Sequence, residues 1–223
     1  MGEPHVIRVT VRSVRVEVRA VPGAELSVEG GHVRRHDDGS YDITADRSHV
    51  SIVCAAGSSV TISTASGPVE TEGPLGSVHV VTASGRVEVA RADELEVRTV
   101  SARVEVGDCR GACRVTSKSG RIEVGTAGSV DLASTSGNVT VGRADLASVR
   151  TVSSRIEIGA SAAARVSAHS ISGRVEVRLL GTSPARLDLR SVSGGIERRV
   201  PEGEGGAHVE ASSTSGAVVV EHG

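Results

Sequence analysis

The chain has no phenylalanine, no tryptophan and a single tyrosine among its 223 residues. Its core must therefore be built from Val, Ile, Leu and Ala, and without large rings that core must be thin. Valine and isoleucine branch at Cβ, which favours strands over helices. The lack of rings also leaves nucleic-acid bases almost nothing to stack on, so no nucleic-acid partner is expected.

Membrane and export signals are missing as well. No stretch approaches the ~18 consecutive apolar residues of a spanning helix, so no membrane insertion is expected. Residues 1–6 lack the basic and then apolar pattern of a signal peptide. Three cysteines, an odd number, indicate a reducing compartment. The net charge of −2, from 25 Lys+Arg and 27 Asp+Glu, does not provide the excess of positive charge that is typical of nucleic-acid-binding proteins. A cytoplasmic location is the expectation.

The chain contains one six-residue motif that recurs along most of its length. Ser84-Gly85-Arg86-Val87-Glu88-Val89 recurs in edited copies, whose opening serines are 18, 17, 18, 17, 17, 19, 21 and 22 residues apart. These serines are Ser66, Ser84, Ser101, Ser119, Ser136, Ser153, Ser172, Ser193 and Ser215. A repeat this regular indicates one structural unit stacked on itself.

Each repeat contains two segments that alternate between apolar and polar residues. The inward positions of one period are predicted to be Leu95, Val97, Thr99, Ser101, Val104 and Val106. The alternation between inward and outward residues shifts by one position at Ser101-Ala102, which is Ser-Gly in most copies. A corner of the chain at this position, with glycine at positive φ, accounts for the shift. Two strands and two corners per period predict an all-β, parallel β-solenoid (β-helix) with about 17–22 residues per coil.

The regular pattern does not cover the whole chain. Residues 1–62 are expected to form irregular N-terminal strands and a cap, and residues 63–223 the regular repeats of one continuous domain. Two longer segments, 179–184 and 198–206, are expected to be loops that extend from one corner.

The Ser-Gly-x-Val-x-Val repeat resembles the bacterial putative-adhesin family of β-strand-repeat proteins, a domain of unknown function. The resemblance covers roughly Val60 to Val220. It implies a β-solenoid and an adhesin-like role, and it offers no catalytic motif. Many relatives are secreted or attached to the cell envelope.

Charged pairs of the form Arg-x-Glu repeat on the predicted outer surface. Their members are Arg86, Glu88, Arg103, Glu105, Arg121, Glu123, Arg155, Glu157, Arg174 and Glu176. Stacked repeats would align them into rows of Arg beside rows of Glu, interrupted by Asn138 and Thr140. Such rows can simply keep the surface soluble, or they can match a periodic partner.

No residue set carries recognisable chemistry, so catalytic, cofactor-binding and metal-binding residues are all predicted to be absent. Residues 32–38 have metal-capable side chains, but a solvated turn accounts for them. Cys113 falls at a predicted core position, and whether it forms a disulfide with Cys109 stays open. The threonines and serines before each corner are expected to hydrogen-bond the corner backbone.

Two functions remain from different classes. The first is a non-catalytic scaffold or adhesin-like module that binds a protein or envelope partner. The second is a structural protein that assembles end to end, because Val218, Val219 and Val220 end the last repeat with no cap after them. A strand edge of this kind pairs readily with another chain.

Overall fold

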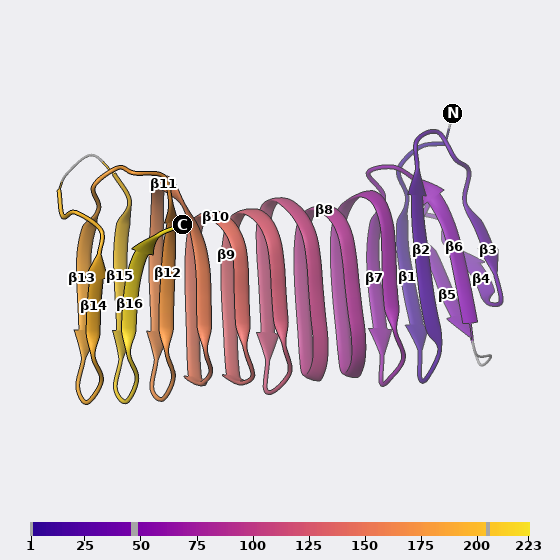
Figure 1. Ribbon diagram of the computed structural model, residues 1–223. Helices are drawn as coiled ribbons and strands as arrows, with labels where there is room; N and C mark the ends of the chain where they lie inside the picture. Colours follow the sequence, from indigo (N-terminus) through magenta and orange to yellow (C-terminus); the bar gives the residue numbers. More distant parts are fainter. Residues whose placement is uncertain (1, 46–48, 204–205) are drawn as a thin grey trace. The chain divides into compact units, whose positions relative to one another are not determined.

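The computed structural model describes residues 2–45, 49–203 and 206–223, so Glu204 and Gly205 of the second predicted loop lie outside the described residues. These residues form sixteen strands and no helix, which confirms the all-β prediction (Figure 1). The chain divides into two compact units, Met1–Gly111 and Ala112–Gly223. The division at residue 62, which rests on sequence pattern, stays a prediction.

Unit 1 contains the strands β1 (Val6–Val11), β2 (Arg15–Val21), β3 (Ser27–Glu29), β4 (His32–Arg35), β5 (Tyr41–Ala45), β6 (His49–Ala55), β7 (Ser59–Thr64) and most of β8 (Val69–Ser117). Unit 2 contains the end of β8 and the strands β9 (Ile122–Ser136), β10 (Val139–Ser153), β11 (Ile156–Ser170), β12 (Val175–Leu180), β13 (Arg186–Ser191), β14 (Ile196–Arg199), β15 (His208–Ser213) and β16 (Val218–His222).

Parallel pairing between equivalent positions of successive repeats dominates unit 2. Val139 pairs with Ile122, 17 positions earlier, and with Ile156, 17 positions later. Leu146 pairs with Arg165 rather than with Ala163, because β11 carries two additional residues between 158 and 165 and the register shifts there. The side chains that alternate inward are almost all Val, Ile, Leu and Ala, and they are buried. The predicted thin aliphatic core is therefore confirmed.

The spatial order of strands in unit 1 differs from their order in the chain. β1 pairs in parallel with β5 on one side and with β7 on the other. In the same way β2 lies between β6 and β8. The short strands β3 and β4 pair antiparallel with β6 and β5. The first strand pair of the chain is thus enclosed by later ones.

Unit 2 repeats this arrangement at the other end of the chain. β16 lies between β12 and β14, and β15 lies between β11 and β13, all in parallel (Figure 1). Val218, Val219 and Val220 are therefore buried and hydrogen-bonded on both sides.

The prediction of an open edge at Val218–Val220 is wrong, because spatial order was inferred from chain order. The strands with an unpaired side among the described residues of this region are β13 and β14. Two apolar residues are exposed there, Val192 at 83% and Ile196 at 39%.

Four of the Ser-Gly corners, at Gly67, Gly85, Gly120 and Gly137, have the predicted positive φ, whereas those at Gly173, Gly194 and Gly216 do not. Gly85 and Gly137 have φ of 118° and 106°. A Cβ on Gly137 would also lie 2.0 Å from the carbonyl oxygen of Gly120 in the neighbouring repeat. Glycine is needed both for the left-handed φ and for the close approach of the stacked backbones.

Hydroxyl groups stabilise these corners, as predicted. Thr82 Oγ1 donates to the carbonyl of Ser84 at 2.8 Å, and Ser117 Oγ donates to that of Ser119 at 2.8 Å. In the copy with Ala102 in place of glycine, Thr99 and Ala102 are buried while Val100 and Ser101 both face outward. Ser101 was expected inside, so the shift comes one residue earlier than predicted.

Gly137→Ala is expected to lower the free energy of unfolding by about 1–3 kcal/mol, since alanine is strained at positive φ and its methyl group meets the Gly120 carbonyl. Gly195→Ala is the matched control, because a Cβ there meets nothing within 4 Å and φ is not positive. Urea denaturation of the two variants measures the difference. Equal stability would contradict this account of the corner.

Candidate functional site

The predicted Arg-x-Glu residues lie on the surface, with the exception of Glu176, which is buried, and they neutralise one another. Arg103 contacts Glu105 at 3.8 Å, and Arg86 reaches Glu105 of the next repeat at 2.9 Å as well as Glu88. The unit 2 pairs are Arg121–Glu123 at 3.5 Å, Arg155–Glu157 at 3.6 Å and Arg174–Glu176 at 3.6 Å. Half-exposed pairs of this kind contribute only ~0–1 kcal/mol each. Each arginine already has a carboxylate partner, so these rows carry little unsatisfied charge.

The glutamate row of unit 2 is interrupted where the sequence predicted. Thr140 pairs in register with Glu123 on one side and Glu157 on the other, which separates their like charges. Glu157 is followed by Glu176, and Glu176 by Val219 of β16.

An ion-pair network fixes the enclosed strand β16 to its two neighbours. Arg178 of β12 contacts Glu176 at 2.5 Å and Glu221 at 3.3 Å, and Arg199 of β14 contacts Glu221 at 3.0 Å. The hydrogen bond to Glu176 is the largest cause that raises the pKa of Arg178. This cluster ties β12, β16 and β14 together, and its role is structural.

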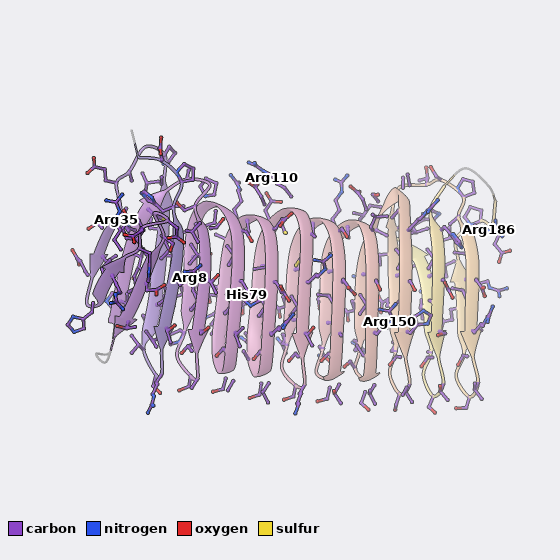
Figure 2. All side chains as sticks on the ribbon, turned by 180° about the vertical axis from the view of Figure 1, so that it is seen from behind. Arg8, Arg35, His79, Arg110, Arg150 and Arg186 are labelled. Atoms are coloured by element: carbon purple, nitrogen blue, oxygen red, sulfur yellow. The ribbon has the colours of Figure 1, made fainter. Side chains whose placement is uncertain are left out.

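The paired segments of unit 2 fall into two sets. The first set, which carries the Arg-x-Glu pairs, comprises residues 122–124, 139–141, 156–158, 175–179 and 218–222. The second set comprises residues 129–134, 146–151, 165–170, 208–213 and 186–191. Figure 2 labels Arg150 and Arg186 of this second set.

A groove of about 570 Å³ lies on the second set, and we call it the unit 2 groove. Its polar lining comes from Arg114, Asp131, Ser148, Arg150, Arg165, Ser167, His208 and Glu210. In register, Ser148 lies between Asp131 and Ser167, and Ser167 is followed by Glu210. The two small serines thus form a floor between two carboxylates. Leu146, half exposed, adds an apolar contact.

Two of the three arginines of the groove, Arg114 and Arg165, lack the carboxylate partners found elsewhere. In Arg114-Val115-Thr116 and Arg165-Val166-Ser167 a hydroxyl stands where the Arg-x-Glu pattern has glutamate. Neither Arg114 nor Arg165 forms an ion pair with another described residue, and Arg150 meets Asp131 only at 3.9 Å. The groove therefore presents guanidinium and hydroxyl donors with unsatisfied capacity.

A hydrogen-bonded chain of side chains borders the groove. His169 Nε2 lies 3.0 Å from Ser167 Oγ, and His169 Nδ1 lies 2.7 Å from Ser212 Oγ. β11, which carries both Ser167 and His169, is paired on both sides, with β10 and with β15. The chain of hydrogen bonds fixes Ser167 in place.

This groove was not predicted from the sequence. Its signal in the sequence is the change from Arg-x-Glu to Arg-x-Thr and Arg-x-Ser in the second segment of two repeats. The Ser-Gly motif belongs to the first set and contains no sign of the groove.

Metal-capable side chains do not gather in the described part of the chain, where no group of three or more could hold an ion. In the turn at residues 32–38, His36 instead contacts Asp42 at 2.7 Å, and Asp38 accepts hydrogen bonds from Ser40. The thiols of Cys54, Cys109 and Cys113 are buried, which confirms the core position of Cys113. Burial raises the pKa of the Cys54 thiol.

The described residues include no helix of the length and apolarity that crossing a membrane requires.

Two solved structures are similar to the chain over most of its length. One is a putative adhesin from Bacteroides fragilis, with 12% identity and a TM-score of 0.49 over 98% of this chain and 93% of that one. The other is a putative cell adhesion protein from Clostridium sporogenes, with 9% identity and a TM-score of 0.25 over 100% and 94%. No curated protein has a matching sequence. The model of the family Toastrack DUF4097 matches residues 6–222, nearly the whole chain. The chain therefore belongs to the Toastrack DUF4097 family, as the resemblance of its repeats implied.

Proposed function

We propose that the protein is a non-catalytic, adhesin-like interaction module that binds a protein partner through the unit 2 groove. The observation that carries this proposal is the contrast between the two sets of strands. Arginines of the first set are paired with glutamates, whereas Arg114 and Arg165 in the groove have no such partner. Surfaces with unsatisfied donors and a concave floor are better suited to recognition than self-neutralised ones.

The strand pairing supports a finer description of the scaffold. We propose that one segment from each set, joined by two corners, forms a coil of a β-solenoid with about 17–22 residues. In this arrangement the Arg-x-Glu rows lie outside the proposed contact surface, because their charges are already matched.

A selection from a random linear peptide library tests the proposed binding function. We expect the full chain to enrich peptides whose binding is lost in Ser148→Trp, because the indole would fill the groove floor. Thr140→Trp is the matched control, since both residues are half-buried positions of β10 and Thr140 lies in the first set. Binding that survives Ser148→Trp, or no enrichment at all, would refute the proposed function.

Self-assembly is a second candidate, now through different strands. The unpaired sides of β13 and β14, with Val192 and Ile196 exposed nearby, could accept a strand from a second copy. Light scattering across a range of concentrations distinguishes the two functions. A persistent monomer would exclude self-assembly and leave the binding module.

A further inference from the structure

We infer that the ligand of the unit 2 groove is an extended, acidic peptide segment of a protein partner. This inference rests on the proposed function and gives it a ligand class. Three properties of the groove lead to it: its unmatched cations, the two carboxylates beside its floor, and its direction across the strands.

One row of residues across the groove contains no acid. Arg165 pairs in register with His208, and His208 pairs in turn with Arg186 of β13. The guanidinium of Arg165 therefore has no opposite charge beside it in this row. A carboxylate bound beside Arg165 would supply that charge.

Hydroxyl donors stand next to the cations. Ser167 lies two residues after Arg165 on the same side of β11, and Ser148 lies two residues before Arg150 on β10. A guanidinium and a hydroxyl together supply several donors to one carboxylate, and hydrogen bonds to an ionised acceptor are stronger than neutral ones. In the Arg-x-Glu pairs of the first set a glutamate stands two residues after the arginine. In the second set Ser167 stands at that position after Arg165, which leaves room for a carboxylate from a ligand.

The rest of the lining disfavours other anions. Asp131 and Glu210 flank the serine floor and would repel a uniformly charged chain such as a nucleic acid. No Phe, Tyr or Trp ring lines the groove for a base or a sugar to stack on. A peptide can place its carboxylates beside Arg150 and Arg165, its own N–H groups or a basic residue beside the acids, and an apolar side chain on Leu146.

The direction of the groove fits an extended chain. Its lining comes from the end of β8 and from β9, β10, β11 and β15, which are consecutive neighbours in the sheet. At ~4.8 Å between strands, these five segments span roughly 19 Å. An extended peptide rises ~3.3 Å per residue, so about six residues would cross the groove.

Fluorescence anisotropy with labelled synthetic peptides tests the ligand class. The probes are a hexapeptide of alternating Glu and Ala, its Gln counterpart and its Lys counterpart. We expect the Glu peptide to bind at least tenfold more tightly than the other two, and more weakly as the salt concentration rises. Arg114→Gln with Arg165→Gln should weaken it at least tenfold.

The matched control is Arg121→Gln with Arg155→Gln, which removes two charges from the first set of the same unit. It should change the affinity less than twofold, and thermal melts should show both double variants folded. Equal binding of the Gln peptide, or an unchanged affinity in the groove variant, would overturn the acidic ligand class. If library peptides still bound in a manner that depends on Ser148, the proposed binding function would stand and only the acidic ligand class would be rejected. Tighter binding of a DNA oligonucleotide than of the Glu peptide would also overturn the inference.

Discussion

Val104→Asp is expected to cost about 3–5 kcal/mol, because it places an unpaired carboxylate in an aliphatic core. Val104 is fully buried in β8, and the neighbouring inward positions Ala102 and Val106 offer no polar partner. The free energy of unfolding of an ordinary domain is about 5–15 kcal/mol. The variant should therefore have a much lower melting temperature than the parent protein, or fail to fold.

Arg103→Ala is the control for this prediction. Arg103 is half exposed, and its ion pair with Glu105 is long at 3.8 Å, so the loss should stay below about 1 kcal/mol. Chemical denaturation followed by circular dichroism measures both variants. Similar losses in the two would mean that inward and outward positions have been assigned incorrectly.

Deletion of residues 215–223 is expected to unfold the end of unit 2 beyond the deleted segment. β16 separates β12 from β14 and pairs with both, so its removal leaves β14 without a partner. The deletion also removes Glu221, which holds Arg178 and Arg199. Hydrogen exchange should show loss of protection in β13, β14 and β15, while β9 and β10 stay protected.

Deletion of Gly223 alone is the matched control. Gly223 contributes one backbone hydrogen bond to Leu179 and follows β16 rather than belonging to it. Its removal should leave exchange in β13–β15 unchanged. Continued protection of β14 in the longer deletion would show that β14 is held by something other than β16.

The regular part of the fold could be predicted from sequence because each residue of the repeat has a local structural reason. The alternation around Val104 and Val106 gives the inward face, and the glycine of the Ser-Gly motif gives the corner. Equivalent residues then pair in parallel at the spacing of the repeat, as Val139 does with Ile122 and Ile156. Local patterns of this kind do not depend on distant parts of the chain.

The order of the end strands could not be predicted in the same way. Val218–Val220 have the alternation of any other repeat, and nothing in that pattern distinguishes an end strand from an enclosed one. The choice is made between β12 and β13, where the chain passes the position that β15 and β16 later occupy. The groove was missed for a different reason, because the absence of a glutamate after Arg165 is meaningful only when its neighbours in space are known.

The enclosed terminal strands impose an order on folding during synthesis. β13 and β14 leave the ribosome before β15 and β16, yet they pair only with those later strands. The end of unit 2 therefore cannot be completed until β15 and β16 emerge, and β13 and β14 must wait unpaired until then. In unit 1, β1 and β2 are made before β5 to β8 but gain both of their neighbours only after those strands have been made. A nascent chain stalled before residue 208 would expose the strands that the finished protein pairs.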